Sequence, residues 1–195
     1  DIHGNQSTAS FNVTVTDDVA PVISGLPADM ILSNDPGNCS TVVTWTAPLV
    51  SDDCSGGILT SSAAPGDTFL EGVTMVTFTA TDFHGNQSTA SFQVTVIDDE
   101  LPVILGMPAD ITQSNDSGSC GAVVTWTEPT AVDNCEIATL TSSHLAGAFF
   151  DVGTTTVTYT ATDIHGNQST ASFNVTVTDD EAPVITNMPA DITQT

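Results

Sequence analysis

One eleven-residue pattern occurs three times at a fixed spacing and limits what this chain can fold into. Asp-x-His-Gly-Asn-Gln-Ser-Thr-Ala-Ser-Phe begins at Asp1, Asp82 and Asp163, so the copies are evenly spaced without insertion or deletion. A constant period of this kind is typical of tandem arrays in which each repeat is one structural unit. We therefore expect copies of one small module rather than a single large core.

The period divides the 195 residues into two whole repeats flanked by two partial ones. Residues 1–17 match the C-terminal part of a repeat and residues 180–195 match the N-terminal part, so we interpret the chain as a segment of a longer array. The whole repeats span residues 18–98 and 99–179, and each has the size of one small sandwich domain.

Alternation of apolar and polar residues predicts strands on both sides of the recurring pattern. Val76, Phe78 and Ala80 alternate with threonines before the turn His-Gly-Asn, and Phe92 and Val94 resume the alternation after it. Such alternation across a Gly-Asn turn indicates a β-hairpin. The first whole repeat contains seven predicted strands, at residues 22–32 (interrupted near Pro27), 41–46, 49–53, 58–62, 68–70, 73–81 and 88–97.

The strand at 49–53 follows a break at Pro48 and is expected to run back along the strand at 41–46. Seven short antiparallel strands with turn residues between them predict an all-β chain of tandem immunoglobulin-like seven-stranded β-sandwiches. In such a fold, Trp45 and Trp126 are expected in the cores.

Lysine and arginine are absent, whereas 24 residues are Asp or Glu, which gives a formal charge of −24. Neutralising phosphate groups needs cationic side chains, so nucleic acid and anionic membranes are excluded as partners. The same absence excludes phosphate-handling enzymes and lysine Schiff-base chemistry. His3, His84 and His165 are one turn residue repeated, so no catalytic constellation forms and we expect no enzymatic activity. We also expect no membrane insertion in this segment.

Four cysteines, Cys39, Cys54, Cys120 and Cys135, form a pair that recurs at equivalent positions of the two whole repeats. Three pairings are possible, and the repeat favours Cys39 with Cys54 and Cys120 with Cys135, because each module is then closed within itself. Closing a loop of this length contributes about 3 kcal/mol in the chain-entropy model. Disulfides imply an oxidising compartment, hence an extracellular location, secreted or on the cell surface. A zinc site is less favoured because no histidine pair accompanies the two thiols of a repeat.

Acidic residues gather at the junctions between repeats. The turn between the last two strands of a sandwich lies beside the preceding junction, so its acids should approach those of the junction. Oxygen ligands in a chain without cations suit Ca²⁺, while an equally weighted alternative is that these residues only occupy turns they favour. The predicted ligands are Asp17, Asp18, Asp82 and Asn86 at one junction and Asp98, Asp99, Glu100, Asp163 and Asn167 at the next. Asp52-Asp53 and Asp133-Asn134 are not included among these ligands, because the assumed disulfides carry them to the opposite end of each module.

Several motifs occur in both whole repeats. They are an acidic opening that ends in Pro21-Val22-Ile23, the run Cys39–Pro48, the turn Asp52-Asp53-Cys54 (Asp133-Asn134-Cys135 in the second repeat), and the run Val76–Asn86. Together they resemble the hyalin repeat, or HYR, domain family over the whole chain. The resemblance implies an immunoglobulin-like fold in tandem extracellular arrays associated with adhesion or surface structure, without catalytic activity.

The loops of the two whole repeats are nearly identical, which favours a structural role. We expect a segment of a surface fibre or adhesin stalk whose partners are adjacent repeats or copies of itself. The alternative is a carbohydrate- or protein-binding adhesion module, which would contact surface glycans or proteins. Such a module would need exposed aromatic residues or a recognition loop distinctive to one repeat.

Four apolar residues stand where the other whole repeat has a polar residue. Such positions are not needed for the shared core, so we expect these side chains on the surface. Large apolar side chains on edge strands favour pairing with another chain in a filament, and scattered surface hydrophobes are the alternative. The predicted interface residues, with their polar counterparts in parentheses, are Ile31 and Leu32 (Thr112 and Gln113), Leu70 (Asp151) and Phe149 (Thr68).

Overall fold

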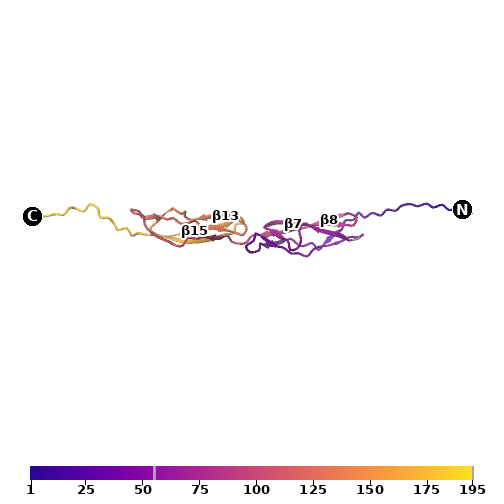
Figure 1. The fold of residues 1–195 in the computed structure, drawn as a ribbon, viewed down its shortest axis with the longest axis horizontal. Coiled ribbons are helices and arrows are strands. Elements are labelled where there is room, and N and C mark those ends of the chain that lie inside the picture. The colour runs from indigo at the N-terminus through magenta and orange to yellow at the C-terminus, as the bar shows by residue number, and fades with distance from the viewer. Residues whose placement is uncertain (55, 195) are drawn as a thin grey trace. The chain divides into compact units, whose positions relative to one another are not determined.

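The computed structural model describes residues 1–54 and 56–194, which contain strands and turns and no α-helix. Ser55 and Thr195, the last residue of the predicted partial repeat, lie outside this description. The chain divides into two units, one formed by residues 1–33 and 40–97 and the other by residues 34–39 and 98–194 (Figure 1). The loop 34–39 thus belongs to the second unit, although the strands on either side of it in the sequence belong to the first. Across the described ranges, no helix is long and apolar enough to cross a membrane.

The first unit has one four-stranded sheet, in the order β2-β8-β7-β5, and two two-stranded sheets, β1-β4 and β3-β6. β2 runs parallel to β8, and the other neighbours are antiparallel. The strands are β1 (Val22–Ser24), β2 (Met30–Ser33), β3 (Ser40–Val42), β4 (Leu49–Ser51), β5 (Gly57–Ser61), β6 (Thr68–Leu70), β7 (Gly72–Asp82) and β8 (Gln87–Ile97).

The second unit repeats this topology. Its four-stranded sheet has the order β10-β16-β15-β13, and its two-stranded sheets are β9-β12 and β11-β14. The strands are β9 (Val103–Leu105), β10 (Ile111–Ser114), β11 (Gly121–Val123), β12 (Thr130–Val132), β13 (Ile137–Ser142), β14 (Phe149–Asp151), β15 (Gly153–Asp163) and β16 (Gln168–Thr178). The prediction of tandem all-β, immunoglobulin-like sandwiches is confirmed.

Two details of the predicted strand order differ from the structure. The interrupted first strand is two strands with different partners, because β1 pairs with β4 whereas β2 pairs with β8. The expected reversal of residues 49–53 along the preceding strand is wrong, since β3 pairs with β6 and β4 pairs with β1. That reversal was needed only to bring Cys54 back to Cys39, a bond that the protein does not form.

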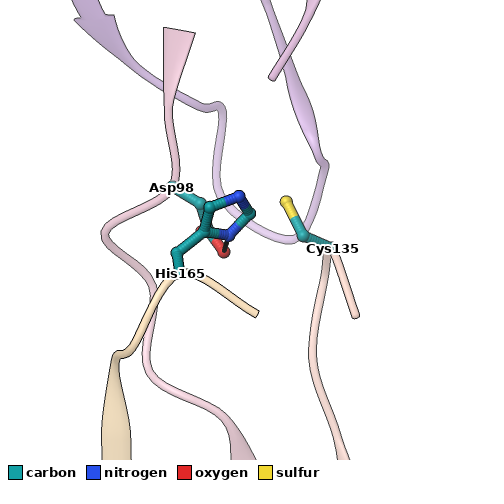
Figure 2. A group of neighbouring side chains, drawn as sticks. All are labelled: Asp98, Cys135 and His165. Carbon is teal, nitrogen blue, oxygen red and sulfur yellow. Dashed lines mark hydrogen bonds and ion pairs between the residues drawn. The ribbon is translucent and has the colours of Figure 1, made fainter. Parts of the chain in front are cut away.

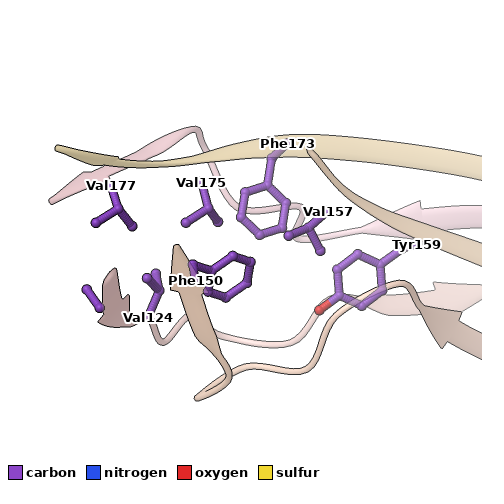
Figure 3. Packing of buried hydrophobic residues seen from close by; sticks show 8 residues of the cluster. Val124, Phe150, Val157, Tyr159, Phe173, Val175 and Val177 are labelled. Carbon is purple, nitrogen blue, oxygen red and sulfur yellow. The ribbon is translucent and has the colours of Figure 1, made fainter. Parts of the chain in front are cut away.

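The core of the second unit lies between its four-stranded sheet and its two-stranded sheets. Phe173, Val175 and Val177 occupy alternate positions of β16, and their side chains face Phe150 and Val124 (Figure 3). Alternate residues of a strand point to the same face, so the period-two pattern places all three in the core. Both tryptophans, predicted in the cores, are partly buried at the edges of the cores. The rings of Trp126 and Trp45 pack edge-on against Phe173 and Phe92, with centroids 5.2 and 5.3 Å apart.

A polar chain of side chains at the edge of this core distinguishes the second repeat from the first. Trp126 Nε1 donates a hydrogen bond to the Tyr159 hydroxyl at 2.6 Å, and that hydroxyl donates to the Glu128 carboxylate. Burial and then the hydrogen bond to Glu128 raise the pKa of Tyr159 above its ordinary value of 10.0. The first repeat has Trp45, Phe78 and Ala47 at these positions, and the buried Nε1 of Trp45 has no hydrogen-bond acceptor.

The four predicted interface residues lie on strands that have one hydrogen-bonded neighbour each. Ile31 and Leu32 are on β2, at the edge of its sheet, while Leu70 and Phe149 are on β6 and β14. Their side chains are 74%, 37%, 73% and 52% exposed, so the predicted exposure is confirmed. The ring of Phe149 also lies over Gly121, where an added Cβ would come within 2.4 Å of it. Phe149 therefore has an intramolecular partner on the surface.

Candidate metal centres and the linking disulfide

The one disulfide among the described residues joins Cys39 to Cys135 within the second unit, with an S–S distance of 2.04 Å. Cys54 and Cys120 are exposed free thiols. The predicted pairs Cys39–Cys54 and Cys120–Cys135 are therefore wrong. The physical reason is that the loop 34–39 folds into the second unit and brings Cys39 to Cys135. The bond spans 96 residues of sequence and contributes about 4 to 5 kcal/mol in the chain-entropy model.

Hydrogen bonds hold the loop 34–39 in place as well. The side-chain amide of Asn34 donates to the backbone oxygen of Asn38 at 2.9 Å and to Asp98 Oδ1 at 3.1 Å. Gly37 adopts a φ of 73°, which favours glycine, and its backbone NH donates to the Glu100 carboxylate at 2.9 Å. The loop therefore has a defined conformation in which Cys39 can meet its partner.

An acidic centre lies beside this loop in the second unit. Oxygens of Asp98, Asp133 and Asp163 all lie within 4.8 Å of one another. Asp98 follows β8, Asp133 follows β12 and Asp163 is the last residue of β15, so three strand ends converge here. The Asp98 side chain is fully buried, and Asp163 is 2% exposed. Asp133 Oδ1 and Asn134 Oδ1 are buried atoms without a hydrogen-bond partner.

The turn after β15 holds Asp163 in its ionised form. Its Oδ1 accepts hydrogen bonds from the backbone NH groups of His165 and Asn167 at 2.8 and 2.9 Å, and its Oδ2 accepts one from the Asn167 side chain at 2.8 Å. Burial opposes ionisation, but these hydrogen bonds outweigh it and lower the pKa of Asp163 below its ordinary value of 3.8. The local-turn interpretation thus accounts for some of the carboxylate's bonds. It does not account for the buried, unpartnered oxygens nearby.

His165 also faces this centre, with its Nδ1 3.2 Å from Asp98 Oδ2 (Figure 2). The sulfur of Cys135 lies beside both side chains (Figure 2). Because that sulfur is bonded to Cys39, it is not available as a thiolate ligand for a metal. The oxygens of the aspartates and Asn134 remain as the donor set, and oxygen donors are those that Ca²⁺ prefers.

The first unit contains the corresponding residues. Ligand atoms of Asp17, Asp82 and His84 lie together, and those of Asp17, Asp53 and Cys54 form a second group. The Asn86 side chain donates to the Asp17 backbone oxygen at 3.2 Å and to Asp82 Oδ2 at 2.7 Å. Burial raises the pKa of Asp82. Hydrogen bonds from Asn86 and the turn backbone lower it by more, so the pKa lies below its ordinary value of 3.8.

Not every predicted ligand reaches these centres. Asp18 and Asp99 are exposed, and neither belongs to the clusters found in the described residues. The Glu100 carboxylate accepts hydrogen bonds from Gly37 instead. By contrast, the structure brings Asp17, Asp82 and Asn86 together, and likewise Asp98, Asp163 and Asn167.

The placement of the Asp-x-Cys turn at the opposite end of the module is wrong. Asp133 lies with Asp98 and Asp163, and Asp53 lies with Asp17. The reason is that β12 pairs with β9 and β4 with β1, which places the residues after β12 and β4 beside the start of each repeat. The direct contacts of the recurring histidines were also missed. One signal was available: His84 follows Asp17 at the same sequence separation by which His165 follows Asp98.

Two similar sandwiches, acidic strand ends and a disulfide between residues of consecutive repeats define a tandem extracellular β module. The chain belongs to the HYR domain family, which matches residues 16–96 and 97–177. This membership and the relatives below place the chain outside the cell, secreted or on the cell surface.

The chain is 37% identical over 202 residues to "Hyalin" of Strongylocentrotus purpuratus, covering 100% of the chain and 17% of that protein. It is 38% identical over 194 residues to "Hyalin" of Lytechinus variegatus, covering 95% and 37%. The rat "Sushi, von Willebrand factor type A, EGF and pentraxin domain-containing protein 1" is 33% identical over 180 residues, covering 87% of the chain and 5% of that protein. The chain therefore spans well under half of each of these relatives.

A solved structure of "Protocadherin Gamma B7 extracellular cadherin domains 1-4" is similar at 19% identity and a TM-score of 0.38, covering 82% of this chain and 50% of that one.

Proposed function

We propose that this chain is a structural segment of an extracellular fibre or adhesin stalk, with its repeats joined end to end. The observation that carries the proposal is the disulfide between Cys39 of the first repeat and Cys135 of the second. The backbone already joins consecutive repeats, and the disulfide adds a second covalent link that holds the loop 34–39 to the second unit under load. In this proposal the chain is not an enzyme. Its turn histidines, junction acids and cysteines recur at equivalent positions of each repeat, where they form turns, junction contacts and the disulfide.

Calcium is the second part of the proposal. Asp98, Asp133 and Asp163 would hold the ion with the side-chain oxygen of Asn134, and Ca²⁺ accepts six to eight oxygen ligands in flexible geometry. The buried, unpartnered oxygens support this fit, since a buried acceptor without a partner is costly. With no Lys or Arg in the chain, His165 and a bound cation are the available counter-charges for three neighbouring carboxylates. The ion would offset their mutual repulsion.

Lateral contact is the third part. Ile31, Leu32 and Leu70 are exposed apolar residues on edge strands, whose unpaired backbone groups can pair with another copy. Copies of the chain are the partners in this proposal.

Chelation tests the calcium and fibre parts together. Adding EDTA to the purified protein should lower the melting temperature, and restoring Ca²⁺ but not Mg²⁺ should recover it, because bound ligand stabilises the folded state by mass action. Electron micrographs of the native material should show linear fibres that become more curved in EDTA. A melting temperature insensitive to both ions would remove calcium from the proposal, and native material without linear assemblies would remove the fibre.

A further inference from the structure

Each of the two free thiols stands at the position that a disulfide-bonded cysteine occupies in the other repeat. Cys54 and Cys135 are the same position in consecutive repeats, and so are Cys39 and Cys120. The bond Cys39–Cys135 has an equivalent one repeat earlier and one repeat later. In each equivalent bond, one cysteine lies within this sequence and its partner lies outside it. Cys120 needs a cysteine like Cys135 in a following repeat, and Cys54 needs a cysteine like Cys39 in a preceding one.

The loop that carries Cys120 already has the conformation of the bonded loop. The Asn115 side chain donates to the Ser119 backbone oxygen at 2.8 Å, as Asn34 does to Asn38 at 2.9 Å. The backbone NH of Gly118 donates to Glu181 at 2.7 Å, as that of Gly37 does to Glu100 at 2.9 Å. Glu181 thus contacts this loop as Glu100 contacts the other.

A cavity of about 320 Å³ lies beside Cys120, lined by Asn115, Ser119, Asp179 and Glu181 among others. At the bonded loop, the Asp133–Cys135 turn contacts the equivalent residues: Asn134 donates to the Asn38 backbone oxygen at 3.2 Å, and Cys135 bonds to Cys39. The surface beside Cys120 is therefore open where an Asp-x-Cys turn would bind.

The turn that carries Cys54 is also preformed. The backbone NH of Cys54 donates to Asp52 Oδ2 at 3.1 Å, as that of Cys135 donates to Asp133 Oδ2 at 3.0 Å. Both halves of the linkage therefore have the geometry of the bonded pair before any bond forms, so little ordering is needed on bonding.

We propose that Cys54 and Cys120 each form this same disulfide with a further repeat of this sequence pattern in the same polypeptide, so that every consecutive pair of repeats is linked. The inference rests on the proposed structural role and deepens it. Each bond joins two thiols, which lose two protons and two electrons. The oxidant is a small-molecule or protein disulfide, which is reduced to two thiols by exchange.

Peptide mapping of the native, unreduced protein tests the inference. Free thiols are first blocked with iodoacetamide, and the protein is then digested with chymotrypsin, since trypsin has no site in this sequence. The Cys39 and Cys135 peptides should be linked to each other. The Cys120 peptide should be linked to a peptide from another repeat that carries an Asp-Asp-Cys or Asp-Asn-Cys turn. The Cys54 peptide should be linked to a peptide from another repeat that carries a cysteine loop like 34–39. Alkylated Cys54 and Cys120 in the native protein, or links to peptides of other types, would overturn the proposal.

Gel mobility separates links within one polypeptide from links between copies. If the bonds lie within one polypeptide, the denatured native protein keeps its chain mass when it is reduced. A fall to smaller chains on reduction would overturn the within-chain assignment. Fibres seen by electron microscopy with both thiols alkylated would leave the structural role standing and refute the linkage alone.

Discussion

His165 Nδ1 lies 3.2 Å from Asp98 Oδ2, and this contact joins the recurring turn to the acid at the junction before its repeat. The same relationship occurs in the first unit, where His84 Nδ1 lies 3.1 Å from Asp17 Oδ2. The histidine of the repeated pattern is thus more than a turn residue, because it contacts a proposed calcium ligand in both units.

This contact makes the histidine rings reporters of calcium binding. Adding Ca²⁺ should shift the ring resonances of His165 and His84 in NMR spectra, because an ion at Asp98 or Asp17 changes the charge beside each ring. His144 is the internal control, since its ring packs against Phe150 away from these acids. Equal shifts at His144 would indicate a general salt effect, and the variant Asp133→Asn should weaken the shift at His165.

The Cys39–Cys135 bond should govern the stability of the second unit. Replacing Cys39 by Ser should lower its free energy of unfolding by about 4 kcal/mol, because the crosslink restricts the unfolded chain over a long loop. Urea denaturation followed by Trp126 fluorescence measures the change, with Trp45→Phe in the background to isolate the signal. Cys54→Ser is the matched control and should leave the stability of the second unit unchanged, because Cys54 lies in the first unit. Equal losses in the two variants would contradict the assignment.

Acid should destabilise both units through their buried turn carboxylates. Asp82 and Asp163 have pKa values below 3.8 in the folded protein, so folding favours their ionised forms. The stability they contribute is complete above the unfolded pKa and is lost as the pH falls through the lower folded value. Melting temperatures between pH 7 and pH 2 should therefore decline mainly below about pH 4. Asp163→Asn should flatten that decline for the second unit, and an unchanged profile would contradict this assignment.

The Trp126–Tyr159–Glu128 chain should stabilise the second unit. Tyr159→Phe leaves the indole NH of Trp126 without its acceptor and should cost about 1 to 3 kcal/mol in denaturant unfolding. Glu128→Gln should lower the pKa of Tyr159 toward 10.0 in a spectrophotometric titration, because it removes the neighbouring carboxylate. Grafting Phe78→Tyr with Ala47→Glu into the first unit supplies the missing acceptor for Trp45. That pair should stabilise the unit more than the two single changes added together, and simple additivity would contradict a coupled chain.

Exchange of the edge-strand hydrophobes for their counterparts tests lateral assembly. The triple variant Ile31→Thr, Leu32→Gln and Leu70→Asp should fold, judged by an unchanged circular dichroism spectrum, and should lose fibres in electron micrographs. Phe83→Thr is the control, because this side chain is 69% exposed in the turn between β7 and β8 rather than on an edge strand. Unchanged fibres in the triple variant would place the contact elsewhere.

Much of the fold follows from local sequence. Alternation in β7, β8, β15 and β16 determines which face of each strand is buried, because successive side chains point to opposite faces of a sheet. The convergence of Asp98 with Asp163 followed from the expected sandwich topology, in which the last turn lies beside the preceding junction. The inclusion of Asp133 did not follow, because it depends on the pairing of β12 with β9, which the predicted strand order did not contain.

The sequence by itself determined the constant repeat period, the strand positions and the absence of lysine and arginine. Only the tertiary structure decided that Cys39 bonds to Cys135 rather than to Cys54. The physical reason lies in the repeat, since Cys54 and Cys135 are the same position in consecutive copies with nearly the same neighbours. A periodic sequence cannot distinguish a bond within a repeat from one to the next. The folding of the loop 34–39 into the second unit makes that choice.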